Sequence, residues 1–397
     1  MAFCFAHAAV EATGTCDDCK KPICTKCTKG TLEGFMCPPC AHKRYGRRKL
    51  VTGLKVGGLM AVVLGVAVLG IFGFGRKPAG DRPKEDPHAE KDPYIASLRE
   101  QRDQAPCDKE AVVKLVRELV KLKRNADAVD DGKAYFAKCG AHPRIDRELI
   151  YPLRQLGRYA EAIKHTTVLV ERDPYDSDYW WWRAEDRDHT NEHPQALADL
   201  RQSFANSANY RYSRFAAARI LDIAGPAGQP CEGVLALDYF VDAHGGTLAH
   251  DLDQRRAGLD LSAQCAARRG RGAAALPPPA DAGTTVEVTI GDVAGTFLVE
   301  ERCGTTALST AFAQLVQLAP RAGAPRVETI AAGKIRSGLP AAVTLAIGKA
   351  VGPDTEVVIV DDLPAGIDGV VGLSFLWKFE LTRRDDDGGL SLSDGTT

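Results

Sequence analysis

The sequence predicts a multidomain α+β protein with four parts: a small metal-binding module, one transmembrane helix, an α-helical region and an all-β domain. Three observations indicate this fold class. The first 40 residues contain regularly spaced cysteines, a long uncharged segment follows them, and the hydrophobic period changes from helical to strand-like near residue 284. A chain of 397 residues with a net charge of −1 is long enough for several compact domains.

Two changes in composition mark the boundaries between these parts. Residues 76–95 are rich in proline, glycine and charge, which is typical of a flexible linker, and residues 268–283 ("RRGRGAAALPPPADAG") form a second linker. The remaining expected parts are, in order, a metal-binding module at 1–42, a basic juxtamembrane segment at 43–49, a transmembrane helix at 50–75, a helical domain at 96–267 and a β domain at 284–397.

The transmembrane prediction rests on residues 56–74 ("VGGLMAVVLGVAVLGIFGF"), which carry no charge. At about 1.5 Å per residue, such a helix just crosses a hydrocarbon core of roughly 30 Å. The basic cluster "HKRYGRRK" before it predicts a single-pass protein with a cytoplasmic N-terminus, contacts with lipid headgroups and an extracytoplasmic C-terminal part, which is periplasmic in a bacterium. A buried helix of a soluble domain and a signal peptide are the alternatives.

Eight candidate metal ligands precede this segment, in four pairs separated by two residues each. They are Cys4 and His7, Cys16 and Cys19, Cys24 and Cys27, and Cys37 and Cys40. Two intervening residues let a tight turn direct both side chains at one tetrahedral ion, as Zn²⁺ prefers, so eight ligands imply two zinc ions. Four disulfides are the alternative, but a cytoplasmic segment is reduced. His42 is an alternative ligand.

This spacing resembles that of a B-box-type, cross-braced zinc module. The resemblance implies that Cys4, His7, Cys24 and Cys27 share one ion and that Cys16, Cys19, Cys37 and Cys40 share the other. Metal binding would provide most of the folding energy of so small a module. Residues 1–49 carry a net charge of 9 − 4 = +5. Because the basic residues cluster beside the predicted membrane, we expect protein or headgroup contacts and no nucleic acid.

Residues 156–174 ("LGRYAEAIKHTTVLVERDP") resemble a tetratricopeptide repeat, which is a pair of helices with a 34-residue period. The matching positions are Gly157, Tyr159, Ala162 and Pro174. A shift of 34 residues places Ala162 on Ala196 and Asp146 on Trp180. The resemblance covers about one and a half repeats and implies a solenoid that binds proteins.

Two further features of the helical region are candidates for function. Trp180, Trp181 and Trp182 are adjacent on a helix and cannot all face one way, so we expect at least one in the core and one exposed. His189 and His193 have the i,i+4 spacing of metal ligands, but they fall in a turn and lack the glutamate placement of a metallopeptidase helix.

Cysteines of the helical region are expected to form disulfides. Cys107 and Cys139 bracket one predicted helical hairpin, which turns near Asn125. Cys231 and Cys265 bracket another, which turns near Gly245-Gly246. The outer ends of an antiparallel hairpin are adjacent, so each pair would meet at disulfide distance.

From Thr284 onward the chain resembles one lobe of a retropepsin-like aspartic protease. The matching segments are the strand "TFLVE", the segment "TALS" with the helix "TAFAQLVQL", the flap-like hairpin "VETIAAGKIRSG" and the segment "IDGVVGLSFL". Such a lobe dimerises, and the resemblance implies a possible homodimer. Each lobe of the family supplies one Asp-Thr-Gly carboxylate to a pair that shares a proton.

The chain departs from the family in this loop, where it reads Glu300-Glu301-Arg302. Glu300 adds a methylene at a crowded axis, and Arg302 replaces a flexible glycine and adds a cation that opposes proton sharing. Two functions remain. The first is a membrane-anchored zinc-binding adaptor with a protein-interaction region and an inactive protease-like domain. The second is a membrane-anchored aspartic endopeptidase that uses Glu300 as a dimer.

Overall fold

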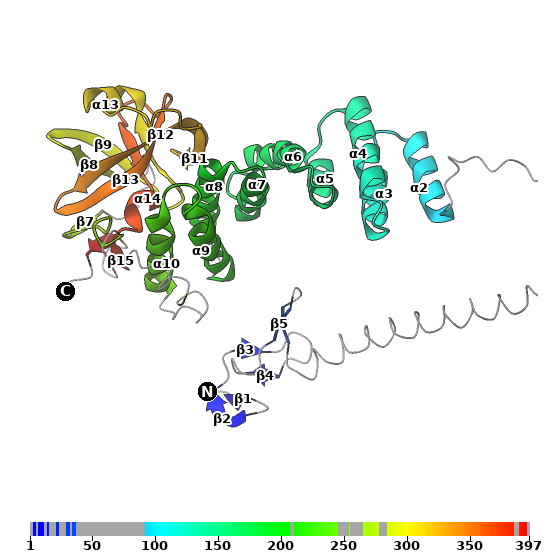
Figure 1. Cartoon of the computed structure of the whole chain (residues 1–397), viewed down its shortest axis with the longest axis horizontal. Coiled ribbons are helices and arrows are strands. Elements are labelled where there is room, and N and C mark those ends of the chain that lie inside the picture. Colours follow the sequence, from blue (N-terminus) through cyan, green and yellow to red (C-terminus); the bar gives the residue numbers. More distant parts are fainter. Residues whose placement is uncertain are drawn as a thin grey trace, which may run out of the picture. The chain divides into compact units, whose positions relative to one another are not determined.

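The chain forms two compact units, residues 1–89 and 90–397, in a computed structural model. The structure describes residues 3–4, 7–11, 14–15, 21–23, 29–31, 34–36, 92–207, 210–244, 254, 265–277, 284–384 and 389–394. In the first unit, short strands pair into three two-stranded antiparallel sheets (Figure 1). They are β1 (Phe3–Cys4) with β2 (His7–Glu11), β3 (Gly14–Thr15) with β4 (Pro22–Ile23), and β5 (Lys29–Thr31) with β6 (Gly34–Met36).

The predicted membrane helix and metal module require a correction. Residues 50–75 lie outside the described residues, and among the described residues no helix is long and apolar enough to cross a bilayer. The longest described helices have 15 residues, which at about 1.5 Å each fall short of a hydrocarbon core of roughly 30 Å. The described residues also contain no group of three or more His, Cys, Asp or Glu that could hold a metal ion. These two findings contradict the predicted single-pass membrane localisation and the predicted fold class with a zinc module and a transmembrane helix.

The structure does not describe the side chains of the eight predicted zinc ligands. Six of the eight lie outside the described residues, and only the backbone is described for Cys4 and His7. These two residues are register partners across the turn between β1 and β2. The two zinc ions expected in this segment stay a prediction.

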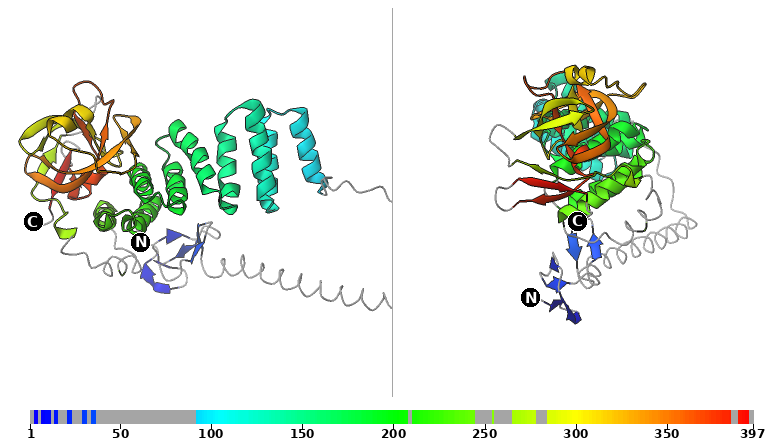
Figure 2. Two further views of the ribbon diagram at one scale, coloured as in Figure 1. Left: turned by 45° about the horizontal axis from the view of Figure 1, so that its top comes forward. Right: turned by 90° about the vertical axis from the view of Figure 1, so that its left-hand side faces the viewer.

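The second unit begins with nine helices in its described residues, and each packs against the next along the chain (Figure 2). The helices are α2 (Pro93–Gln104), α3 (Lys109–Lys121), α4 (Asn125–Cys139), α5 (Pro143–Gln155), α6 (Tyr159–Arg172), α7 (Ser177–His189), α8 (His193–Asn206), α9 (Tyr210–Ala224) and α10 (Pro230–His244). Contacts between successive helices are typical of a solenoid, so the predicted helical repeats are confirmed.

The 34-residue period extends over more of the chain than the sequence indicated. The N-cap residues of α3, α5 and α7 are Asp108, His142 and Asp176, and each side chain accepts a hydrogen bond from the backbone N–H two residues later. The inner turns repeat in the same way, because Lys123, Gly157 and Asn191 all have positive φ, of 60°, 69° and 62°. Only one of these three is glycine, which explains why the sequence revealed the period only around Gly157.

Close helix packing follows the same spacing. Ala128, Ala162 and Ala196 are each fully buried. They lie near the starts of α4, α6 and α8, where a methyl group lets the paired helix approach closely.

The predicted disulfides are present. Cys107 and Cys139 are bonded at the outer end of the α3–α4 hairpin, and Cys231 is bonded to Cys265. The turn expected near Gly245-Gly246 lies outside the described residues, and α10 pairs with α9.

The C-terminal β domain contains a seven-stranded sheet in the order β11-β12-β13-β10-β14-β9-β8, closed on itself by a pairing of β12 with β8. Its strands are β8 (Thr284–Ile290), β9 (Val293–Val299), β10 (Thr306–Ser309), β11 (Val327–Ala331), β12 (Lys334–Ile347), β13 (Ala350–Val360) and β14 (Gly369–Val371). Short helices α13 (Thr310–Leu315) and α14 (Leu373–Leu376) follow β10 and β14. A second sheet contains β15 (Glu380–Arg383), β16 (Leu390–Ser393) and β7 (Ala274–Leu276), which lies within the predicted linker.

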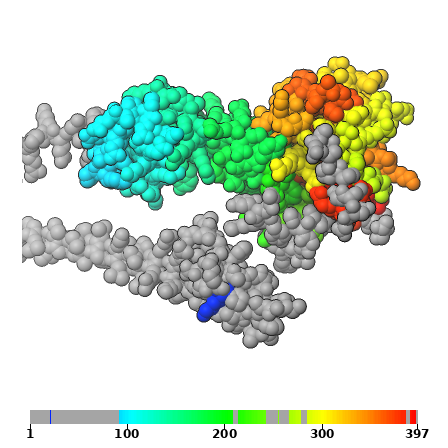
Figure 3. All heavy atoms as spheres, turned by 180° about the vertical axis from the view of Figure 1, so that it is seen from behind, coloured from blue at the N-terminus to red at the C-terminus, as the bar shows by residue number. Residues whose placement is uncertain are grey.

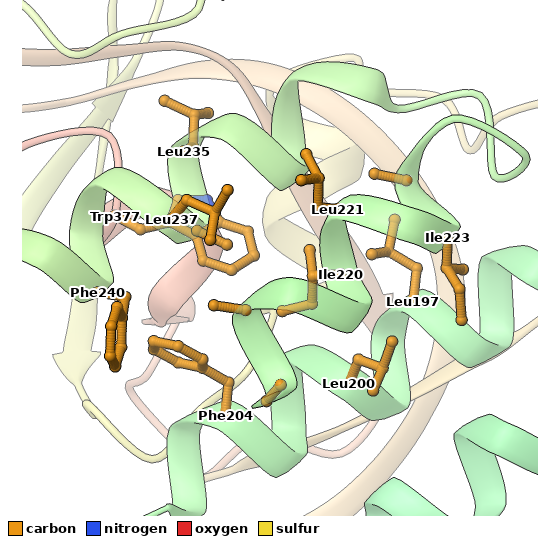
Figure 4. Packing of buried hydrophobic residues seen from close by; sticks show 14 of the residues in the cluster. Leu197, Leu200, Phe204, Ile220, Leu221, Ile223, Leu235, Leu237, Phe240 and Trp377 are labelled. Carbon is orange, nitrogen blue, oxygen red and sulfur yellow. The ribbon is translucent and has the colours of Figure 1, made fainter. Parts of the chain in front are cut away.

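The helices and the β domain share a hydrophobic core. Leu373 and Trp377, which lie in and just after α14, pack among buried side chains of α8, α9 and α10 (Figure 4). In the space-filling view, the green atoms of the last helices adjoin the orange and yellow atoms of the β domain (Figure 3). The last helices of the solenoid are therefore also part of the β domain's core.

We predict that the Cys107–Cys139 bond holds the α3–α4 hairpin closed. Changing both residues to serine should lower the free energy of opening this hairpin by about 3–4 kcal/mol, because the bond closes a loop of 32 residues. Amide hydrogen exchange in α3 and α4 should then accelerate by two orders of magnitude or more. Exchange in α7 and α8, which lie further along the solenoid and belong to a different hydrophobic cluster, is the internal control. Unchanged exchange in α3 and α4 would contradict the prediction.

Candidate functional site

The candidate site is the loop between β9 and β10, residues 300–305, where the sequence resemblance placed the catalytic loop of an aspartic protease. Backbone hydrogen bonds hold this loop against β14 and α14. The Glu300 N–H donates to the Val371 carbonyl at 3.0 Å, and the Leu373 N–H donates to the Cys303 carbonyl at 2.8 Å. The three residues that replace Asp-Thr-Gly are thus held on a fixed backbone.

Glu300 caps the tip of the β11–β12 hairpin, which is the flap-like hairpin expected from the sequence. Its Oε2 accepts a hydrogen bond from the Ala332 N–H at 3.1 Å. Ala332 and Gly333 form the hairpin tip with positive φ angles of 50° and 72°. Burial raises the pKa of Glu300, opposed by the hydrogen bonds from Ala332 and Gly333 and by the charge of Arg336. The carboxylate therefore stabilises the hairpin of its own domain.

The next two residues of the loop have different partners. Glu301 forms an ion pair with Arg383 of β15 at 2.9 Å. The guanidinium of Arg302 lies over the ring of Tyr175, 5.4 Å from its centroid. Tyr175 precedes α7, so Arg302 contacts the helical region.

Gln202 of α8 connects this loop to the hairpin strand β11. Its Nε2 donates to the Arg302 carbonyl at 2.6 Å. Its Oε1 accepts from the N–H groups of Gly304 at 3.1 Å and Ile330 at 2.8 Å. The side chain is fully buried. One amide from the helical region thus satisfies three backbone groups of the β domain that would otherwise be buried without partners.

The backbone of α8 itself lies directly on the loop. A Cβ atom at Gly304 would lie 2.7 Å from the Gln202 nitrogen, which is closer than side chains tolerate. Glycine is therefore required at this position by the approach of the helix. The side of the loop formed by residues 302–304 is covered by α8.

A buried ion pair reinforces the same contact. Arg183 of α7 and Asp199 of α8 are both fully buried and lie 2.7 Å apart. Arg183 also contacts Glu328 of β11 at 2.7 Å. Next to it, Trp180 packs with Ile330 of β11 in a small apolar cluster. Hydrogen bonds, charge and apolar packing thus all join α7 and α8 to β11.

The remaining side of the loop opens into a cavity of about 540 Å³. Its lining includes Tyr175, Asn206, Thr284, Glu300 and Arg302. An acidic and a cationic side chain therefore line this space. Cys303 does not: it is fully buried, its Sγ donates to the Thr305 carbonyl at 3.0 Å, and burial raises the pKa of its thiol.

The other predicted residues lie elsewhere. Trp180 is fully buried, whereas Trp181 and Trp182 are half-buried. The ring of His189 stacks on that of Tyr159, and His193 contacts Asp188 at 3.2 Å. These two histidines therefore have separate partners.

Sequence reasoning missed Gln202, Arg336 and Tyr175. Each makes a contact between segments more than 20 residues apart. Arg336 pairs with Asp362, and its Nε also donates to the Ala331 carbonyl of its own hairpin at 2.9 Å. The sequence held one indication of the contact with α8, which was Gly304, since an isolated glycine next to a strand indicates a close backbone approach.

Comparisons with known proteins find limited similarity. No protein-family model matches the chain, and no curated protein matches it. A crystal structure of a MamA protein has 14% identity and a TM-score of 0.33, and the match covers 42% of this chain and 85% of that one. MamA from Desulfovibrio magneticus RS-1 has 12% identity and a TM-score of 0.32, with 38% and 86% covered. A retropepsin-like aspartic protease from Rickettsia conorii has 20% identity and a TM-score of 0.22, with 30% and 89% covered.

We predict that Gln202 is the main polar link between the helices and the β domain. Gln202→Leu fills the space but leaves buried groups of Arg302, Gly304 and Ile330 unpaired, so it should lower the free energy of unfolding by about 2–4 kcal/mol. Gln195→Leu is the matched control on the same helix, because the Gln195 Oε1 has no hydrogen-bond partner among the described residues. Equal effects of the two variants in urea unfolding would contradict the prediction.

The raised pKa of Glu300 predicts a pH-dependent contribution to stability. The folded protein binds this proton more tightly than the unfolded chain, so the contribution is full below the ordinary pKa of 4.5 and is lost as the pH rises through the raised value. Glu300→Gln keeps an acceptor for the Ala332 N–H but cannot ionise. Its stability relative to the unaltered protein should therefore increase with pH over this interval and then remain constant. A difference that does not vary with pH would show that the folded-state pKa is not raised.

Proposed function

We propose that this chain is a protein-binding scaffold. Its helical repeats recognise other proteins, and its β domain is a retropepsin-like domain without proteolytic activity. The stacked 34-residue repeats support the first part, because such solenoids present a continuous face to a partner. The observation that carries the second part is the contact of Gln202 and the α8 backbone with the loop at 302–304.

The chemistry of the loop supports this proposal. Aspartic protease chemistry needs two carboxylates that lie together and share a proton. Glu300 instead accepts a hydrogen bond from the hairpin tip of its own domain, and Glu301 is paired with Arg383. A second acid cannot approach from the side of residues 302–304 without displacing α8.

One observation favours a second candidate, an aspartic endopeptidase active as a homodimer. Glu300 lines the open cavity, and its raised pKa is the direction that a shared proton requires. In this case a second copy of the β domain would have to bring its own Glu300 into the cavity.

The two candidates are separated by a cleavage assay with the full-length chain. We expect no cleavage of a peptide library between about pH 3 and pH 7, the range in which carboxylate pairs work. The unaltered protein and Glu300→Gln should give the same background. Cleavage by the unaltered protein that is abolished in Glu300→Gln would overturn the scaffold proposal in favour of the endopeptidase.

A further inference from the structure

A second cavity, of about 260 Å³, lies on the helical region and shares no lining residue with the cavity beside the loop at 300–305. Three successive helices contribute to it. Its lining residues are Ser177, Asp178, Trp181 and Trp182 of α7, Ser203 of α8, and Phe215 of α9. Its apolar lining comes mainly from three aromatic rings.

The three aromatic rings of this cavity remain partly accessible. Trp180 turns into the core, where its Nε1 donates to the Pro174 carbonyl at 2.7 Å, while the next two tryptophans face the cavity. Phe215 is 49% exposed, although large apolar side chains are mostly buried in this unit. The Trp182 ring already carries a cation on one side, because the guanidinium of Arg147 lies 5.7 Å from its centroid. These rings are therefore accessible to cation–π contacts.

Asp178 places a negative charge beside these rings. Its backbone N–H donates to the Asp176 side chain at 2.9 Å, which fixes the start of α7. Its own carboxylate has no hydrogen bond or ion pair with any of the described residues. Burial and the neighbouring Asp176 raise the pKa of Asp178, and Arg147 opposes them. The carboxylate thus lies beside apolar surface, and the charge of Arg147 offsets only part of the cost of its burial, so a bound cation would stabilise it.

We propose that this cavity receives an arginine or lysine side chain of a partner protein. The aliphatic stem packs between the rings of Trp181, Trp182 and Phe215, and the charged end pairs with Asp178. This inference rests on the proposed protein-binding function and names the chemistry of the partner's anchoring residue. Charge complementarity carries it, since a half-buried acid surrounded by aromatic faces fits a cation with an apolar stem better than an acidic or neutral side chain.

The test uses small probes and the full-length chain. Tryptophan fluorescence and saturation-transfer NMR would follow titration with N-acetyl-arginine-N-methylamide, its α-acetylated lysine counterpart and the citrulline counterpart, which has nearly the same shape as arginine without the charge. We expect the arginine or lysine probe to bind with a dissociation constant in the millimolar range and the citrulline probe about fivefold more weakly. Equal binding of the charged and neutral probes, or no binding of the charged ones, would overturn the proposal.

Variants assign the binding to this cavity. Asp178→Asn and Phe215→Leu should each weaken binding of the charged probe about fivefold. Phe215→Leu provides a readout from an exposed position if Asp178→Asn perturbs the helix. The matched control is Glu110→Gln, because Glu110 has the same place two residues after the N-cap of α3. No effect of either cavity variant, or an equal effect of the control, would overturn the proposal.

A further probe separates the proposed occupant from a small-molecule ligand. Tetramethylammonium bound more tightly than the amino-acid probes would identify a quaternary ammonium pocket and would overturn the protein-partner proposal. These outcomes are independent of the cleavage assay, so failure of this inference is distinguishable from failure of the proposed function.

Discussion

The structure of the second unit depends on the burial of α8 against the β domain. Every residue from Ala196 to Phe204 is buried, so this helix has no face left for solvent. A helix enclosed on all sides must satisfy its polar side chains internally, and Gln202 and Asp199 do so with groups of β11, of the loop at 300–305 and of α7. Because these bonds are buried, loss of one partner leaves the other unpaired, so the helical region and the β domain stabilise each other.

This contact accounts for the surroundings of the loop at 300–305. A helix of the same chain covers residues 302–304, and Glu300 supports the hairpin tip. The longer side chain of glutamate reaches the N–H of Ala332, and the cation of Arg302 lies over Tyr175, where it contributes to the same contact.

The periodic parts of the fold were predictable from the sequence, and the contacts between distant segments were not. The strands of the β domain and the alanines at 34-residue spacing follow from local patterns, since strand alternation and helix packing are imposed on neighbouring residues. The remaining repeats were hidden because Lys123 and Asn191 adopt a backbone conformation that usually indicates glycine. Gln202 was invisible for a different reason: its partners lie about 100 residues away, and a glutamine on a helix is ordinarily a solvent-exposed residue. The predicted single-pass membrane anchor is wrong: no helix among the described residues is long and apolar enough to cross a bilayer.

The solenoid has two unequal ends. At α2–α4 the helices pack against one another and against α5, and the α3–α4 hairpin is closed by its own disulfide. At α8–α10 the same kind of helices form part of the core of a different fold. A 34-residue repeat could therefore be lost only at the N-terminal end. There, its removal would expose the face of the next repeat, which is equivalent to the face that was lost. In this chain the number of N-terminal repeats could therefore change without disturbing the β domain, whereas a change in the last hairpins would disrupt the core that they share with it.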